Sequence, residues 1–200
     1  MCNLYTQSKS VDEVAQLFRN LDLPLSFPDG IPNLQPRDIC ITDPAPIVRR
    51  NASDEKRHEL IVRRWSWPGN NGKPVYNFRS EGRDFNSQRC LIVADGFYEF
   101  TTPADPKQKR KDRWLFSSAS EPMLGIAGLM RDAPGVGEAF TMLTTEPGPD
   151  VVPYHGRQVV ALPMAEWRGW LDYSVAAKDV LKPLPAGSLE VRQVVAEQLL

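Results

Sequence analysis

Cysteine and histidine are scarce in this sequence. Its 200 residues include three cysteines, Cys2, Cys40 and Cys90, and two histidines. The cysteines lack the paired spacings of a zinc site, so the sequence predicts no metal and no other cofactor. A sparse, odd set of thiols also argues against a disulfide framework and fits a reducing cytoplasm. Cys40 and Cys90 lie in apolar, strand-like runs, where we expect buried, unreactive thiols.

Long hydrophobic runs and an excess of charge of one sign are also absent. No stretch approaches the roughly 18 apolar residues of a membrane span, and the first apolar stretch is too short and too charged for a signal peptide. We therefore expect a cytoplasmic protein without a membrane partner. Lys plus Arg number 24 and Asp plus Glu 25, a net charge of −1. This balance excludes a strongly basic, histone-like binder but permits a local basic groove.

The sequence does not alternate strands with long helices, which argues against a doubly wound parallel sheet. Its length and 42% hydrophobic content suit one domain over residues 1–200. The pattern predicts an α+β fold, a single compact domain around a curved, largely antiparallel β-sheet, barrel-like, with a few flanking helices. Strands are expected at 39–42, 58–67, 89–100 with a turn at Asp95-Gly96, 114–117, 123–130, 139–145, 159–162 and 189–195.

Few helices are expected. Ser10-Val-Asp-Glu13 is a capping box, and apolar residues keep helical spacing over 11–20. Pro163 suits the first turn of a second helix, which carries two tryptophans and a leucine on one side. The remaining expectations are a short helix near 174–182, a turn-rich stretch at 24–47 and a solvated basic hairpin loop at 107–113.

Cys2 follows Met1 directly, and methionine removal is favoured before a small residue. Removal would leave an amine and a thiol on adjacent carbons, with ordinary pKa values of about 8 and about 8.5. Both groups would then be partly nucleophilic at neutral pH. Such a 1,2-aminothiol can open an amide or ester, or condense with an aldehyde to a five-membered thiazolidine. Taken alone, Cys2 favours the simpler reading, an accident of a frayed terminus without function.

Three further segments carry polar residues in unusual places. Asn77, Arg79 and Glu81 are two residues apart and share one face of an extended segment. Glu99 lies among aromatic residues, where desolvation should raise the pKa of its carboxyl towards a useful acid–base value. His155 is followed by glycine and arginine. Each also has a structural reading, as a turn residue, an edge-strand charge or a core histidine.

Taken together, Cys2, Asn-x-Arg-x-Glu (77–81), Gly-Phe-Tyr-Glu (96–99) and His-Gly-Arg (155–157) resemble the motifs of the SOS response-associated peptidase (SRAP) family. The resemblance implies a DNA damage protein that captures abasic sites in single-stranded DNA through a thiazolidine on Cys2. It also implies self-removal of Met1. The sequence departs from the family at Asn3-Leu4, where Gly-Arg is usual, and in lacking tryptophans around Glu99.

The side chains permit these roles. Glu99 and His155 can supply protons for opening the sugar and losing water, and Asn77 can hold the α-amine of Cys2. The expected catalytic set is therefore Cys2, Asn77, Glu99 and His155. Arg79 and Arg157 are expected to contact phosphates. The residues expected to stack on bases are Trp65 and Trp67, with Tyr76 and Phe78, and core packing is the alternative for two of these four.

Two other functions fit part of the pattern. An N-terminal-nucleophile amidohydrolase of the glutaminase type also begins with a cysteine and uses an asparagine at its oxyanion. Such enzymes usually have a longer chain with more helices. A non-catalytic single-strand-binding module would not need Cys2. If the resemblance to the SRAP family holds, we expect a monomer whose partner is single-stranded DNA containing abasic sites.

Overall fold

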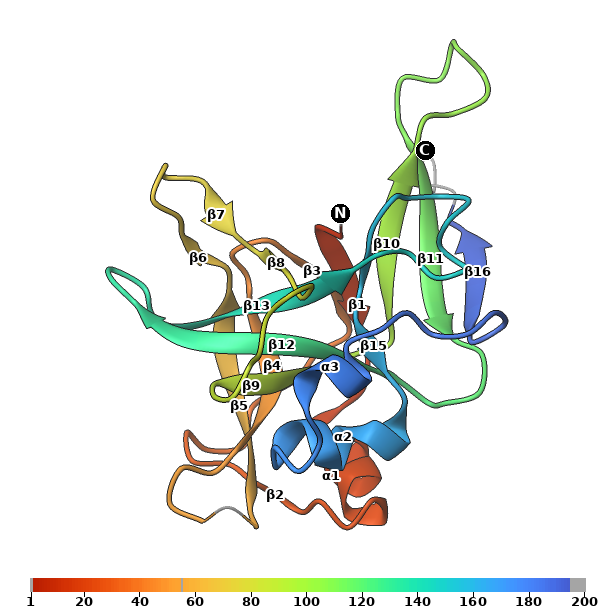
Figure 1. Cartoon of the computed structure of the whole chain (residues 1–200). Helices are drawn as coiled ribbons and strands as arrows, with labels where there is room; N and C mark the ends of the chain where they lie inside the picture. Colours follow the sequence, from red (N-terminus) through yellow and green to blue (C-terminus); the bar gives the residue numbers. More distant parts are fainter. Residues whose placement is uncertain (1, 55, 195–200) are drawn as a thin grey trace.

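The centre of the molecule is a closed ring of strands. The computed structural model describes residues 2–54 and 56–194 (Figure 1). Around the ring the five strands are β13 (Gly137–Thr145), β12 (Leu124–Ala133), β9 (Arg89–Ala94), β4 (Pro44–Arg50) and β5 (His58–Trp65). Neighbours pair antiparallel except at the closure, where β5 pairs with β13 in parallel at Arg64 and Ala139. The predicted α+β fold with a curved, largely antiparallel, barrel-like sheet is confirmed.

Short strands extend this sheet at its edges. β8 (Asn77–Arg79) runs parallel to β13, and β14 (Gln158–Val159) pairs antiparallel with β13. Thr144 of β13 is opposite both Arg79 and Val159, so the segments around residues 77–81 and 155–159 meet at one end of β13. The other short strands of this sheet are β2 (Leu25–Ser26) and β15 (Ala161–Leu162).

A second, antiparallel sheet holds the start of the chain. Its order is β16 (Leu189–Gln193), β11 (Asp112–Ser118), β10 (Gly96–Thr101), β1 (Leu4–Gln7) and β3 (Arg37–Cys40). The chain passes from β9 into β10 through Asp95, so the predicted turn at Asp95-Gly96 is a bend between two sheets. Glycine is required at position 96, because a Cβ there would lie 2.5 Å from the carbonyl oxygen of Phe116.

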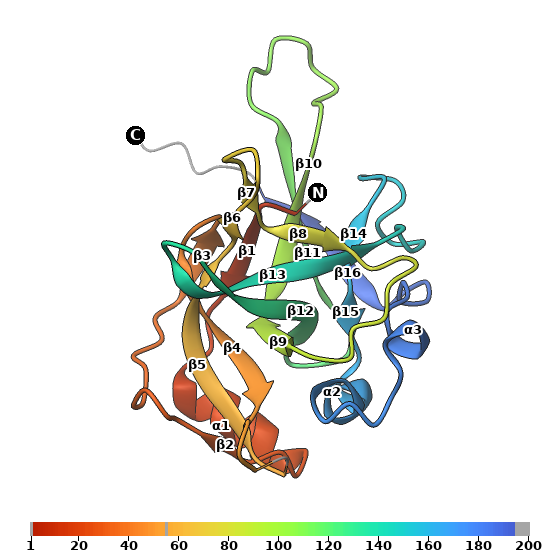
Figure 2. The same ribbon diagram turned by 60° about the vertical axis from the view of Figure 1, so that its left-hand side comes forward.

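Two hairpins project from the same end of the molecule as the start of β1 (Figures 1 and 2). One is formed by β6 (Trp67–Pro68) and β7 (Pro74–Val75). The other joins β10 to β11 and carries exposed lysines, as predicted for the basic run at 107–113. Arg113 itself already belongs to β11 and is paired with Asp38.

The helices lie at the opposite end of the molecule (Figure 1). α1 (Val11–Asn20) has the predicted capping box, with the side chain of Ser10 accepting the N–H of Glu13. α2 (Met164–Leu171) buries both of its tryptophans against α1 and the barrel. α3 (Ala177–Val180) is a single turn, shorter than expected. Within residues 2–54 and 56–194, no helix is long and apolar enough to cross a membrane.

Several strands differ from prediction for identifiable reasons. β4 was expected to be irregular because of its prolines. β4 pairs with β9 only from Ile47 onward. Pro44 and Pro46, which have no N–H to donate, therefore lie where β4 forms no hydrogen bonds with β9. The strand predicted at 58–67 is interrupted at Ser66, whose φ is +91°. β1 was not predicted, and Val195 of the last predicted strand lies outside the described residues.

The two cysteines predicted to be core thiols have different environments. Cys90 is buried, and burial raises the pKa of its thiol. Cys40 is exposed, so the prediction is wrong for this residue. It ends β3, the edge strand of its sheet, where only Ile39 is buried.

Candidate functional site

The four predicted catalytic residues come from four separate segments and meet at one place. Cys2 directly precedes β1, and β1 pairs with β10, which carries Glu99. Asn77 begins β8, and His155 lies just before β14, so both flank the same end of β13. Three links join the group. The amide of Asn77 contacts the backbone of Cys2, the charge of Glu99 acts on the Cys2 thiol, and His155 acts on Glu99.

Asn77 holds the backbone of Cys2. Its Nδ2 donates a hydrogen bond to the carbonyl oxygen of Cys2 at 2.7 Å. Its Oδ1 is buried and has no hydrogen-bond partner among the residues that the structure defines. A buried, unpaired acceptor is unfavourable, so this oxygen is suited to a donor that arrives with a substrate or after processing.

The thiol of Cys2 is buried, with 1% of the residue exposed. The Sγ–H donates to the carbonyl oxygen of Leu4 at 3.2 Å. Burial, with a smaller contribution from the charge of Glu99, raises the pKa of the thiol to about 12. The expectation of a partly ionised thiol at neutral pH is therefore wrong for this conformation, since the thiol needs a base to become nucleophilic.

Glu99 is a buried carboxyl, with 2% of the residue exposed. It lies in β10, opposite Trp114 of β11. Burial raises the pKa of Glu99, and His155 acts in the opposite direction. The predicted effect of the aromatic surroundings is confirmed. A carboxyl with a raised pKa exchanges protons more readily near neutral pH than an exposed one.

His155 is positioned by the backbone around it. A turn closes when the N–H of His155 donates to Val151 O at 3.0 Å. The turn is held to the C-terminal segment by Asp150, which accepts the N–H groups of Gly187 and Leu189. The Nδ1 of His155 lies 3.0 Å from the backbone nitrogen and 2.7 Å from the backbone oxygen of Arg157. These two contacts hold one edge of the imidazole ring against the backbone of Arg157.

Arg157 joins two segments of the site. Its guanidinium binds both carboxylate oxygens of Glu81 at 2.5 and 3.0 Å. It also donates to the carbonyl and hydroxyl oxygens of Thr144 at 2.9 and 3.1 Å. The pair lowers the pKa of Glu81. The predicted phosphate contact is thus replaced in this conformation by an internal ion pair that ties the end of β8 to the loop of His155.

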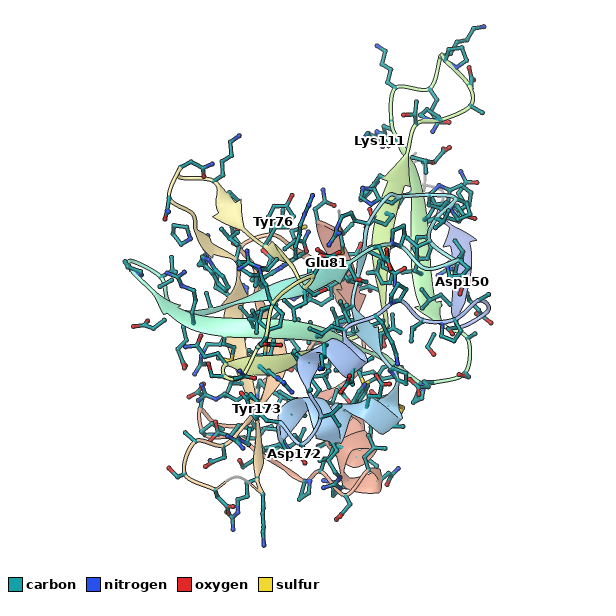
Figure 3. The ribbon with its side chains drawn as sticks, viewed as in Figure 1. Tyr76, Glu81, Lys111, Asp150, Asp172 and Tyr173 are labelled. Carbon is teal, nitrogen blue, oxygen red and sulfur yellow. The ribbon has the colours of Figure 1, made fainter. Side chains whose placement is uncertain are left out.

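Arg79 is exposed on β8, between Asn77 and Glu81. Within residues 2–54 and 56–194 it makes no ion pair or side-chain hydrogen bond, so its guanidinium is available to a ligand. In Figure 3, Tyr76 and Glu81 mark the two ends of this segment, on the side of the molecule where the chain begins, and Lys111 marks the base of the basic hairpin. The exposed guanidinium of Arg79 could therefore contact an anionic ligand bound next to Cys2 and Asn77.

Trp65 and Trp67 are core residues. Trp65 is fully buried, donates its Nε1–H to Tyr76 O at 2.9 Å and packs edge-on against Tyr5. Trp67 is buried with the guanidinium of Arg131 over its ring at 5.2 Å. The expectation that they stack on bases is wrong for this conformation, and the alternative of core packing holds. Tyr76 and Phe78 are half-buried, and Arg83 covers the ring of Phe78.

Some residues that support the site were missed. Tyr98 donates to Asp38 at 3.0 Å and lies under the guanidinium of Arg113, which fixes β10 against β3 and β11. The signal available was the position of Tyr98 next to Glu99. Thr144, which binds Arg157, carried no signal, because a threonine in a strand is ordinary. No cluster of metal-ligating side chains occurs within the described ranges.

The fold and the site define a class of protein: a small α+β barrel in which a cysteine at position 2 lies beside an asparagine, a buried carboxyl and a histidine. A family model described as SOS response associated peptidase (SRAP) matches residues 1–197. The chain belongs to this family.

Curated relatives are similar to the chain in sequence, and solved structures share its fold. The chain is 26% identical to the abasic site processing proteins YoqW and YoaM of Bacillus subtilis (strain 168), over 97% of this chain and 92% and 91% of theirs. A protein from Bordetella bronchiseptica has a similar fold, with a TM-score of 0.71 and 24% identity over 97% of this chain and all of that one. One from Bacteroides thetaiotaomicron has a TM-score of 0.73 at 17% identity, over 98% and 93%.

Proposed function

We propose that this protein captures abasic sites in single-stranded DNA as a thiazolidine on Cys2, once Met1 has been removed. The observation that carries the proposal is the placement of Cys2, held by Asn77 and adjacent to the buried carboxyl of Glu99. The names of the Bacillus relatives support the choice of substrate.

The reaction condenses an aldehyde with an aminothiol. The freed amine of Cys2 adds to the open aldehyde of the abasic sugar, and the resulting carbinolamine loses water to give a Schiff base. The thiol then adds to the C=N carbon and its proton passes to the nitrogen. One molecule of water is released and no oxidant or reductant is consumed. Glu99 and His155 carry the protons that opening the sugar, losing water and closing the ring require.

Asn77 orients the nucleophile in this scheme. Its Nδ2 keeps the carbonyl of Cys2 in place, and its buried Oδ1, unpaired within the described part of the chain, accepts an N–H of the α-amine. The high pKa of the Cys2 thiol keeps the sulfur protonated unless a base takes its proton. The amine therefore reacts first and the thiol second, with Glu99 as the base that deprotonates it.

Removal of Met1 is the second activity that we infer. While the Met1–Cys2 peptide bond is intact, the nitrogen of Cys2 is an amide and cannot form a Schiff base. Glu99 takes the proton of the Cys2 thiol, the sulfur attacks the carbonyl carbon of Met1, and the C–N bond breaks as that proton passes to the nitrogen. The acyl group is then on sulfur and the amine is free. Water then hydrolyses the thioester. Producing wild type and Glu99→Ala in one host and comparing intact masses distinguishes self-removal from removal by a host aminopeptidase.

Phosphate contacts would come from exposed cations near the site. Arg79 lies close to Asn77 on β8, and the β10–β11 hairpin, which carries exposed lysines, projects from the same end of the molecule (Figure 2). Their local charge is compatible with the net charge of −1, because the field that DNA meets depends on where the charges lie.

Crosslinking on a denaturing gel tests the proposal. Wild type should form a stable adduct with single-stranded DNA that carries an abasic site, and Cys2→Ala should form none. Cys2→Ser keeps the amine and should give only a Schiff base that borohydride can trap. Cys40→Ala removes the exposed thiol and is the matched control, with wild-type crosslinking expected.

Other outcomes point to the alternatives. Equal crosslinking by Cys2→Ala and wild type would exclude the thiazolidine. Hydrolysis of glutamine without crosslinking would indicate an amidohydrolase. DNA binding that survives Cys2→Ala without any covalent product in either protein would indicate a single-strand-binding module.

A further inference from the structure

Arg89 is a buried cation whose described partners are all uncharged. The residue is 3% exposed and lies at the start of β9, away from Cys2. Its Nε donates to Phe85 O at 2.7 Å, and its Nη1 donates to Trp170 O and Val175 O at 3.3 and 3.0 Å. Its Nη2 makes no hydrogen bond within the part of the chain that the structure defines. The rings of Trp170 and Tyr173 lie 4.6 and 4.8 Å from the guanidinium carbon.

Such an arrangement is electrostatically incomplete. Carbonyl oxygens and aromatic faces stabilise a guanidinium, but they do not neutralise its charge. Burial lowers the pKa of Arg89, and the electrostatic effects of Tyr173 and Asp172 oppose this only in part. Burying a charge without a counter-ion is costly. An anion that reached Arg89 would therefore be bound with a gain in stability.

A hollow of about 430 Å³ opens beside Arg89. Arg49, Arg50, Arg131 and Tyr173 line it with the loop at 86–88, and so do Asp132 and Glu138. Glu138 is already held by Arg49 and Arg63 at 2.7 and 2.8 Å, so its charge is compensated. The Oη of Tyr173 accepts the backbone N–H of Arg89 at 3.0 Å, so its own hydroxyl proton remains to donate elsewhere.

We propose that this hollow binds a phosphate group. Arginine presents paired N–H donors that match phosphate oxygens, and Arg50, Arg89 and Arg131 line one cavity. Arg50 also donates to the carbonyl oxygen of Asp172 at 3.4 Å, and Arg131 also lies over the ring of Trp67, so each has donors beyond that contact to share with a phosphate. Arg131 also lines a second hollow, under the β6–β7 hairpin, together with Phe78 of β8. Arg131 is thus shared by the two hollows, whereas Tyr173, which lines the first, lies well away from Tyr76 and Glu81 in Figure 3.

The phosphate can belong to a nucleic acid strand or to a free phosphate compound, and the chemistry of the site is the same for both. The proposal does not rest on the reaction at Cys2. It rests on the geometry around Arg89, and its test uses no abasic DNA.

Thermal unfolding in inorganic phosphate, at constant ionic strength with chloride, is the first arm of the test. Phosphate should raise the Tm of wild type in a saturable way. Arg131→Ala and Arg50→Ala change the rim and leave Arg89 in place, and each should weaken the apparent phosphate affinity by about tenfold, the effect of one lost charge-assisted hydrogen bond. Arg19→Ala, on the exposed face of α1, is the control and should behave as wild type.

The second arm measures binding of an undamaged single-stranded oligonucleotide with and without phosphate at the same ionic strength. Competition by phosphate, lost in Arg131→Ala, assigns the site to a nucleic acid strand. If phosphate raises the Tm in a saturable way but does not compete with the oligonucleotide, the site binds a free phosphate compound. No phosphate-dependent rise in Tm, or the same rise in both rim variants as in wild type, would overturn the proposal.

Discussion

At the scale of single residues, burial decides the chemistry of the site. The same desolvation raises the pKa values of the Cys2 thiol and the Glu99 carboxyl. For the thiol this suppresses the nucleophile, and for the carboxyl it favours proton exchange near neutral pH. The two effects suit a reaction in which the amine attacks first and a nearby base later activates the sulfur.

Glu99 and His155 should divide the proton transfers. Glu99→Gln removes the titrating group next to Cys2 and should slow both formation and release of the adduct. His155→Ala should slow mainly formation. The expected loss is about 10²–10⁴-fold for a true general acid or base. A crosslinking time course measures formation, and a chase with excess unlabelled abasic DNA measures release. Wild-type rates in both phases for Glu99→Gln would remove Glu99 from the mechanism.

His58 should make stability depend on pH. It is 2% exposed, and neither ring nitrogen has a hydrogen-bond partner within the described ranges. Burial lowers its pKa below the usual value, while Asp172 opposes this and Arg168 and Arg50 add to it. The unfolded state therefore binds the extra proton first, so stability should fall as the pH drops below about 6.5 and level off below the folded-state pKa.

Chemical denaturation of wild type and His58→Phe from pH 5 to pH 8 checks this expectation. The variant should lose the part of the pH dependence that lies just below pH 6.5, since phenylalanine does not titrate. His155→Ala is the control for the other histidine. An identical pH dependence in wild type and His58→Phe would contradict the assignment.

At the scale of elements, the two arginines of the motifs should behave differently. Arg79 is exposed on β8, so Arg79→Ala should weaken DNA capture and flatten its salt dependence by a slope of about 1. Arg157 ties β8 to the loop of His155, so Arg157→Ala should slow capture without changing the salt slope. Fluorescence anisotropy over a salt series separates the two effects.

Glu81→Gln removes the ion-pair partner of Arg157 and is the control for a structural role of that arginine. Because Glu81 is about half exposed, we expect a coupling energy of only about 1 kcal/mol in a double-mutant cycle with Glu81→Gln. Arg157→Ala should lower the Tm as Glu81→Gln does. A salt slope reduced to the same extent in Arg157→Ala as in Arg79→Ala would assign Arg157 to phosphate binding instead.

Elements with local signals were predictable from the sequence. The capping box located α1, and apolar and aromatic runs located β9, β11, β12 and β13. β1 and β4 were missed because neither has a clear local pattern. β4 starts with two prolines in three residues, and its strand conformation depends on pairing with β5 along its whole length. The bend at Asp95 was located, but its role in moving the chain between sheets depends on tertiary structure.

At the scale of the whole molecule, the site exists only because distant segments meet. The order of short motifs was enough to nominate Cys2, Asn77, Glu99 and His155, and the structure brings all four together. Burial was predictable for Glu99, whose neighbours in sequence are aromatic, but not for Cys2. The hydrogen bond from Asn77 to Cys2 and the ion pair of Arg157 with Glu81 each join residues about 75 positions apart along the chain. Such contacts have no local signal in the sequence, so neither the burial of Cys2 nor this ion pair was predictable.

Peptide mass mapping of the adduct tests the central claim most directly. Wild-type protein is reacted with abasic single-stranded DNA, digested with nuclease and protease, and each modified residue is located by mass. The account predicts one modified peptide, which begins at Cys2, lacks Met1 and carries the sugar remnant minus one water. An adduct on Cys40 or a lysine, or fully active protein that retains Met1, would contradict it.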